Sequence, residues 1–251
     1  MTPQGARLRG RSPSSLGLMT LKTLGATLSL SEEEQALIRL LGLYRETIPS
    51  GALFDPDGRE ARPRLILQGW ACRQRILSDG QRQIFGFLLP GDGVGLSAEA
   101  RALDGASVAA LTRVEYADAS MLREILALQD ARHDRLRRGL ALARLYEDAC
   151  LLDHVVRLGR QAAPARLGHL FLELRDRLHR AGLGFGDRLH LPLTQETLAD
   201  ALGLSLVHVG RTLGQMRRDR LIALEGGWLT ILDEARLRLA CDYNPDHPAL
   251  H

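Results

Sequence analysis

The amino-acid sequence predicts an α+β protein with an antiparallel β domain, a long central helix and a small C-terminal domain of helices and a β-hairpin. Short extended runs divided by glycine, proline and aspartate fill residues 48–117, a pattern typical of antiparallel strands. Residues 130–160 contain no proline and keep apolar residues at helical spacing. Residues 164–231 combine further helical spacing with a final strand–turn–strand pattern, and the 251 residues of the chain suffice for two domains with separate cores.

A helix is expected before the β domain, and a hairpin is expected within it. Ser31 is followed by acidic residues up to Glu34, which is typical of a capped helix N-terminus. Ser78-Asp79-Gly80 separates two strand-like runs, so these runs should pair as a β-hairpin. The predicted strands cover residues 65–67, 70–77, 81–89, 107–111 and 113–117.

The central segment predicts a single amphipathic helix. Its arginines lie on other faces than its apolar residues, which recur every three to five positions. These apolar residues are Leu136, Leu140, Ala143, Tyr146, Leu151 and Val155. Such a helix either packs against its own β domain or pairs with the same helix of a second copy.

The segment around Gly203 predicts two short helices joined by a tight turn. Thr194 and Ser205 are suited to cap the two helices, and Gly203 can adopt the positive φ that the turn requires. Ala199 is small where the helices would approach each other, and Val209 is apolar where the second helix would dock. The other apolar positions form the side expected to be buried: Leu198, Leu202, Leu204, Leu213 and Met216.

The outer side of this helix pair carries residues suited to bind DNA. Val207, His208 and Arg211 stand near the front of the second helix and are free to point outward. A basic cluster at residues 217–220 follows where phosphates would run, and residues 221–231 predict a wing of two strands. Two helices followed by a wing are typical of a winged helix-turn-helix, whose second helix enters the major groove.

Other function classes fit the sequence less well. The helix pair also fits an ordinary helical hairpin, or a signal-sensing module whose winged helix binds a protein partner instead of DNA. The basic cluster favours DNA, since an acidic or apolar outer face would favour protein. No phosphate-binding glycine loop, nucleophile elbow or metal-ligand spacing occurs, so neither an enzyme nor a metal site is predicted. No apolar run approaches the roughly 20 residues of a membrane span. The three scattered cysteines predict reduced thiols in the cytoplasm.

Two stretches of the chain resemble one family of bacterial proteins. Residues 191–231 contain Leu-Thr-Gln-Glu-Thr-Leu-Ala-Asp-Ala-Leu-Gly-Leu-Ser and then Val-His-Val-Gly-Arg-Thr-Leu, and residues 69–92 contain Gly-Trp-Ala-Cys-Arg and Pro-Gly-Asp. Both are similar to transcription regulators of the cyclic AMP receptor protein and Fnr superfamily (Crp/Fnr), and the resemblance covers residues 20–240. It implies a β-roll of the cyclic-nucleotide-binding, jelly-roll type, a dimerisation helix and a winged helix-turn-helix. It also implies a homodimer that binds a palindromic promoter site and contacts RNA polymerase.

The resemblance also sets the expected domain boundaries. We expect a sensor β-roll at residues 21–128, a dimerisation helix at 129–160 and the DNA-binding domain at 161–241. The chain should begin with a disordered tail at residues 1–20, with Met19 as an alternative start, and end with a tail at 242–251. We favour pairing of the central helices in a homodimer, because a dimer presents two recognition helices to a two-fold symmetric site.

Roles on DNA are carried over only where this sequence matches the family. Arg211 matches the recognition-helix arginine and is expected to read O6 and N7 of a guanine. The position of a common acidic base-reading residue holds Val207, so base preference should differ, with Val207 beside a thymine methyl group and His208 at a base or phosphate. Phosphate contacts are expected from Thr194, Ser205, Thr212, Arg217 and Arg218.

The sensing half departs from the family at its ligand positions. Gly95-Leu96 stands in place of a Gly-Glu pair, and Ala106-Ser107 lies where an arginine pair would grip a cyclic phosphate, so no cyclic nucleotide is expected. No cysteine precedes Leu41, which excludes the family's iron–sulfur cluster. Haem could use Cys72, His133 or His154 as axial ligands, but scattered residues of these types are more often structural, so no haem is expected. The sequence identifies no effector.

Overall fold

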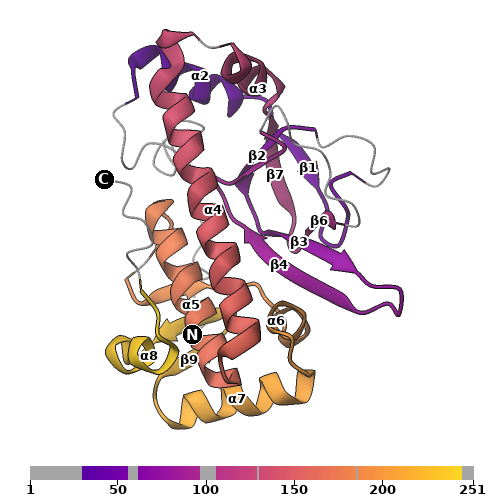
Figure 1. The fold of residues 1–251 in the computed structure, drawn as a ribbon, viewed down its shortest axis with the longest axis vertical. Coiled ribbons are helices and arrows are strands. Elements are labelled where there is room, and N and C mark those ends of the chain that lie inside the picture. Colours follow the sequence, from indigo (N-terminus) through magenta and orange to yellow (C-terminus); the bar gives the residue numbers. More distant parts are fainter. Residues whose placement is uncertain (1–29, 56–61, 97–105, 129, 185, 245–251) are drawn as a thin grey trace, which may run out of the picture.

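The central helix α4 (Asp134–Arg160) runs along the molecule and contacts both of its domains (Figure 1). The computed structural model describes residues 30–55, 62–96, 106–128, 130–184 and 186–244. The β domain lies beside the N-terminal part of α4, whereas the C-terminal helices gather around its other end. The predicted α+β architecture is confirmed.

Two antiparallel sheets build the β domain. The four-stranded sheet has the order β1 (Glu46–Ile48), β7 (Val114–Asp118), β2 (Arg64–Gln68) and β5 (Gly93–Val94). The three-stranded sheet has the order β4 (Arg82–Leu88), β3 (Ala71–Ile76) and β6 (Ala106–Ala110). The predicted hairpin joins β3 and β4, with Gly80 at φ 84°. The sequence did not reveal β1 and β5, because two or three residues are too few for a visible alternation.

Helices α2 (Glu32–Leu41) and α3 (Ser120–Ala127) cover one end of the β domain together with the start of α4. Ser31 caps α2 as predicted: its hydroxyl accepts a hydrogen bond from the Glu34 amide at 3.2 Å, and the Glu34 carboxylate accepts one from the Ser31 amide at 2.8 Å. The second Glu34 oxygen accepts a hydrogen bond from the amide of Leu136 at 2.9 Å. The cap of α2 therefore also satisfies a free amide in the first turn of α4.

The two halves of α4 have different surroundings. In the N-terminal half, Leu136 is buried, and Leu140 and Ala143 pack beside it against α2 and α3. In the C-terminal half, Leu151 and Val155 are exposed. Leu136, Leu140 and Ala143 therefore pack against the protein's own β domain, whereas Leu151 and Val155 are exposed to solvent. A short 3-10 turn at Ala131–His133 precedes α4, so the long helix begins at Asp134.

The C-terminal domain is a helical unit with a three-stranded wing. Its elements are α5 (Ala163–Arg180), β8 (Arg188–His190), α6 (Gln195–Leu202), α7 (Leu206–Arg218), β9 (Ile222–Glu225), β10 (Trp228–Ile231) and α8 (Glu234–Cys241). The wing has the order β8-β10-β9. Gly168 lets α8 approach α5, because a Cβ there would lie 2.8 Å from Leu237 Cδ1.

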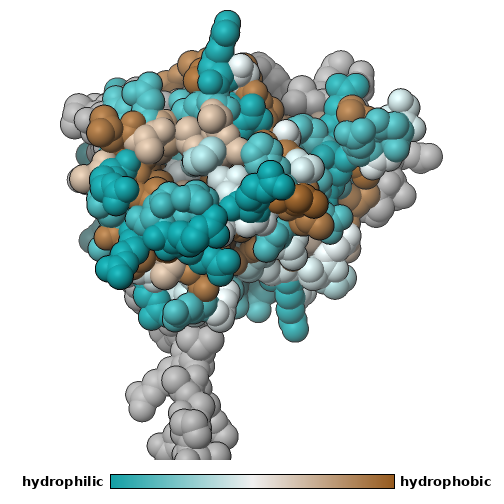
Figure 2. All heavy atoms as spheres, turned by 90° about the horizontal axis from the view of Figure 1, so that it is seen from below, coloured by the Kyte–Doolittle hydropathy of each residue, from teal (hydrophilic) through white to brown (hydrophobic). Residues whose placement is uncertain are grey.

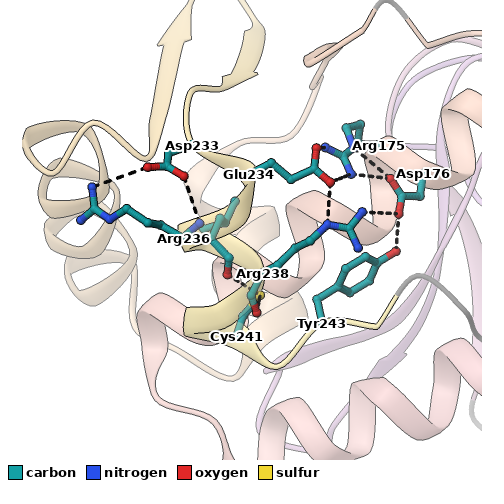
Figure 3. Close-up of polar contacts among 9 residues, drawn as sticks. Arg175, Asp176, Asp233, Glu234, Arg236, Arg238, Cys241 and Tyr243 are labelled. Carbon is teal, nitrogen blue, oxygen red and sulfur yellow. Dashed lines mark hydrogen bonds and ion pairs between the residues drawn. The ribbon is translucent and has the colours of Figure 1, made fainter.

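The C-terminal domain extends further than its predicted end at residue 241. Tyr243 is buried, and its hydroxyl donates a hydrogen bond to Asp176 Oδ2 at 2.8 Å (Figure 3). The ring of Tyr243 is buried and its hydroxyl is hydrogen-bonded to α5, as is usual for a buried tyrosine. Part of the predicted tail therefore belongs to the packed domain. The predicted tail at residues 1–20 lies outside the described residues.

The two domains share one apolar core. Ile84 and Phe87 of β4 and Cys72 of β3 belong to the same buried group as Leu170 and Leu198 of the C-terminal domain. This contact places α6 directly against β4. None of the helices in the described part of the chain is long and apolar enough to cross a membrane.

Candidate nucleic-acid interface

The turn between α6 and α7 has the geometry that the sequence predicts. The Thr194 hydroxyl accepts a hydrogen bond from the Thr197 amide at 3.0 Å, and the Ser205 hydroxyl accepts one from the His208 amide at 3.2 Å. Gly203 adopts φ 60° and ψ 41° after the last residue of α6. Both caps and the left-handed turn residue are confirmed, so α7 leaves α6 across a short and fully specified turn.

The inner face of α7 is fixed against the domain core. Val209, Leu213 and Met216 are buried at helical spacing. Gly210 admits the start of α6, because a Cβ at this position would lie 3.0 Å from Gln195 Oε1. Gln195 was not among the predicted site residues. Its place in the first turn of α6 puts its side chain beside Gly210 of α7.

The outer face of α7 is open to solvent. Val207 is 68% exposed, and His208 and Arg211 are also exposed. Helical geometry puts Val207, Arg211 and Arg218 on the side opposite Val209, because positions four and eleven residues apart fall near one line. Figure 2 looks onto this end of the molecule, where hydrophilic side chains cover much of the surface and apolar patches lie between them.

The arginines of α7 differ in whether their side chains are hydrogen-bonded within the protein. Within the described residues, the side chain of Arg211 has neither a hydrogen-bond partner nor an ion-pair partner, and the same holds for Arg217. Arg218 donates a hydrogen bond to Gln215 Oε1 at 2.7 Å, and Gln215 in turn donates to Asp219 at 2.9 and 3.0 Å. Among the α7 arginines, Arg211 and Arg217 therefore lack an acceptor in the described part of their own chain.

One residue predicted to contact a phosphate, Thr212, does not lie on the outer face of α7. The side chain of Thr212 is buried, and its hydroxyl donates a hydrogen bond to the carbonyl of His208 at 2.8 Å. Thr212 follows Val209 by three residues, so both side chains fall on the inner face of the helix. Thr194 and Ser205 are exposed, as are Arg217 and Arg218, and these remain at the surface where a phosphate backbone could pass.

A positive φ at the end of α7 directs the chain into the wing. Arg220 has φ 56°, its amide donates to the carbonyl of Arg217 at 3.1 Å, and the amide of Leu221 donates to that of Met216 at 3.0 Å. These two hydrogen bonds form a Schellman motif, in which a glycine would be usual. Arg220, a member of the predicted basic cluster, is exposed there.

The wing contributes a second set of exposed groups. Gly226 and Gly227 join β9 and β10 with φ values of 58° and 79°. On the neighbouring strand, the guanidinium of Arg188 lies 5.0 Å from the Trp228 ring, and the ring of His190 lies 5.4 Å from it at a steep angle. The sequence did not predict β8, although its Arg-Leu-His alternation matches its exposed–buried–exposed pattern.

The candidate cofactor residues lie on separate elements. Cys72 is on β3, His133 on the turn before α4, and His154 on α4. Burial raises the pKa of the Cys72 thiol to about 11 and lowers the pKa of the His154 imidazole to about 4, so both are neutral at pH 7. The described residues contain no group of three or more His, Cys, Asp or Glu side chains able to hold a metal ion. Leu96 packs beside the core under α2 and α3.

Comparison with known proteins assigns the family. Residues 165–240 match the model of the Crp-like helix-turn-helix domain. The nitrogen fixation regulation protein FixK of Bradyrhizobium diazoefficiens is 36% identical over 173 residues, which cover 68% of this chain and 70% of that protein. The chain belongs to the Crp/Fnr superfamily. It is a DNA-binding transcription regulator, as the helix-turn-helix predicted.

Further relatives agree with this assignment. The transcriptional activatory protein AadR of Rhodopseudomonas palustris is 30% identical over 194 residues, or 75% of this chain and 77% of AadR. The structure of FixK2 from Bradyrhizobium japonicum has a TM-score of 0.63 at 24% identity and covers 78% of this chain and 96% of that one. The Crp/Fnr fold therefore extends over both the β domain and the winged helix-turn-helix.

Proposed function

We propose that this Crp/Fnr regulator binds a palindromic promoter site as a homodimer, with the α7 helix of each copy in a major groove. The observation that carries the proposal is the outer face of α7, where Arg211 is exposed and has no acceptor among the described residues. An exposed arginine whose donors are unused by the described residues is available for the O6 and N7 atoms of a guanine.

The exposed half of α4 supports a homodimer. Leu145, Leu152 and Val156 are exposed and lie seven and four residues apart, so they form one apolar line along the helix. A contiguous apolar stripe on a helix is typical of a surface that packs against another helix. The partner we propose is α4 of a second copy, since two-fold symmetry suits two identical half-sites.

We assign the contacts of α7 as follows. Arg211 reads a guanine, and Val207, which precedes it by one turn on the same face, lies against a thymine methyl group. His208 contacts a base or a phosphate from the flank of the helix. Phosphate contacts come from the exposed cap residues and the basic end of α7, which position the protein without reading sequence: Thr194, Ser205, Arg217 and Arg218.

The competing function is a signal-sensing module whose winged helix binds a protein. That reading needs an outer α7 face that is apolar or acidic. The exposed cations Arg211, Arg217 and Arg220 favour a polyanion instead.

We also propose that the protein acts in the cytoplasm as an activator that contacts RNA polymerase and needs no bound cofactor. Two relatives, AadR and the FnrL protein of Cereibacter sphaeroides, are named transcriptional activators. Leu96 packs beside the domain core and offers no carboxylate to a ribose, and the thiol of Cys72 is buried. Transcription from a promoter carrying the selected site, with purified polymerase, should rise when the protein is added.

The test is selection of duplexes from a randomised pool by the full-length protein, at about 0.15 M salt so that non-specific binding stays weak. The expected result is a two-fold symmetric site whose half-sites are centred about 10 base pairs apart. Light scattering should give the mass of a dimer, and Leu152→Asp should reduce that mass, whereas Leu239→Asp on α8 should not. A monomer, or binding that enriches no sequence, would refute the proposal.

A further inference from the structure

Strand β4 is tied to the first helix of the helix-turn-helix by an ion pair. Arg82 Nε lies 2.6 Å from Asp200 Oδ2 of α6, and the two side chains are partly exposed. Beside this pair, Ile84 of β4 packs in the same apolar core as Leu198 of α6. The apolar contact holds the two elements together, while the ion pair restricts how they can slide or rotate against each other.

A second polar contact holds the other end of β4. Arg177 of α5 donates one hydrogen bond to the carbonyl of Phe87 at 2.8 Å and another to Asp92 Oδ2 at 2.6 Å. The same Asp92 oxygen accepts a hydrogen bond from the amide of Leu89 at 2.7 Å, which fixes the carboxylate in its turn. Because hydrogen bonds are directional, two acceptors on one guanidinium specify its orientation.

The contact continues into α4 through buried charges of alternating sign. Arg177 Nη1 lies 3.5 Å from Glu173 Oε1, and Glu173 Oε2 accepts a hydrogen bond from Arg157 of α4 at 2.7 Å. The side chains of Glu173 and Arg157 are only 6% and 3% exposed. Buried charges must stay paired, so Asp92, Arg177, Glu173 and Arg157 together favour one arrangement of the β domain, α5 and α4.

These contacts leave the reading face of α7 open. The inner face of α7 packs into the core that α5 and α6 share, so the three helices move as one unit. Val207 and Arg211 remain exposed while β4 is docked. The docked arrangement therefore orients the helix-turn-helix without covering it.

We propose that the Arg82–Asp200 pair and the Arg177–Asp92 contact form an interdomain clamp that sets the separation of the two recognition helices in the dimer. Paired α4 helices and two clamps would place the two α7 helices at one distance and one angle. These four side chains are positioning residues, because they act on DNA binding through α5 and α6. The inference rests on the proposed homodimer on a two-fold site.

The decisive experiment measures how strictly the protein requires one spacing between half-sites. The full-length wild type and the double variant Arg82→Ala/Asp92→Asn are titrated with the selected operator and with operators whose spacer is one base pair shorter or longer. One base pair displaces a half-site by about 3.4 Å along the duplex. Arg75→Ala is the matched control, because Arg75 is an exposed cation on the neighbouring strand β3.

The wild type and Arg75→Ala should bind the altered spacers about ten-fold more weakly than the selected one, a loss comparable to that of a mismatched base pair. For the double variant, the affinities for the selected and the altered spacers should be nearly equal. Its affinity for a single half-site should match that of the wild type. Thermal melting checks that it remains folded. If the double variant does not fold, the test is a charge exchange: Arg82→Asp alone should lose the spacing preference, and Arg82→Asp/Asp200→Arg should restore it.

Two outcomes would contradict the inference, and they differ in what else they affect. If the wild type selects a two-fold site but the double variant keeps the same spacing preference, the clamp is refuted and the proposed function stands. If the wild type selects no two-fold site, the homodimeric DNA-binding proposal fails and the clamp fails with it.

Discussion

Buried arginines and the arginines on the recognition helix have opposite surroundings. The side chains of Arg157, Arg175 and Arg177 are 3%, 5% and 11% exposed, and each lies within 2.7 Å of a carboxylate oxygen. Figure 3 shows the buried kind, with Arg175 between the carboxylates of Glu234 and Asp176. Arg211 and Arg217 are exposed, and within the described residues neither side chain has a partner.

The difference shows what separates a structural arginine from one that can read DNA. A guanidinium stays protonated in a protein and offers five donors, so it needs acceptors wherever it lies. Inside the molecule its own chain supplies them. On the outer face of α7 the described residues supply no acceptor to Arg211 or Arg217, which leaves both for the acceptors that a second molecule brings.

The largest effect should come from removing a buried guanidinium. Arg177→Met leaves the carboxylates of Asp92 and Glu173 without this partner, and breaking such a buried pair costs about 3–5 kcal/mol of folding free energy. Urea unfolding of the full-length protein measures the loss. The exposed variant Arg217→Ala should stay within about 0.5 kcal/mol of the wild type. Similar stabilities of all three proteins would remove the distinction between the two kinds of arginine.

The next effect should appear in DNA binding and not in stability. Arg211→Ala should weaken binding to the selected operator by about 1–3 kcal/mol per contact and relax the preference at one base pair. Binding to a scrambled duplex should change little, because a guanine contact contributes only where the guanine stands. Fluorescence anisotropy with both duplexes measures this, and an unchanged sequence preference would refute the role of Arg211.

A smaller effect should follow from the methyl contact of Val207. Replacing thymine with deoxyuridine removes one methyl group, which is worth about 0.8 kcal/mol when buried, or about four-fold in affinity at each half-site. The wild type should lose this affinity at one thymine, whereas Val207→Ala should bind both duplexes alike. Leu206→Ala, at the exposed neighbouring position, should retain the loss. If Leu206→Ala and not Val207→Ala became insensitive, the methyl contact would belong to Leu206.

The smallest change in sequence preference should come from Arg217. Arg217→Ala should weaken binding to the operator and to the scrambled duplex alike, and it should lower the slope of log affinity against log salt by about 1. A titration series at several salt concentrations measures this slope. A loss confined to the operator would mean that Arg217 reads a base.

The features predicted correctly from the sequence depend on residues close together in the chain. Ser31, Thr194 and Ser205 bond to amides three residues away, and Gly203 acts on its own backbone. Such local hydrogen bonds and φ values follow from residue type and spacing. The local pattern of residues therefore suffices to predict where α7 begins.

The features that the sequence did not reveal depend on tertiary contacts or on helical phase. Arg175 also bonds to Glu234, 59 residues away, and Arg177 bonds to Asp92, 85 residues away, separations that no local pattern encodes. Arg220 adopts a positive φ because two helix-ending hydrogen bonds hold it there. Thr212 was predicted to face outward, although its spacing from Val209 already placed it on the inner side.

The most direct test of the account asks whether Arg211 contacts a guanine N7. In the selected operator, each conserved guanine is replaced in turn by 7-deazaguanine, which keeps base pairing and removes the N7 acceptor. The account predicts that one such position weakens binding by the wild type and has no further effect on Arg211→Ala. If the replacement weakened binding by both proteins equally, Arg211 would not read that guanine, and the central role assigned to the outer face of α7 would be contradicted.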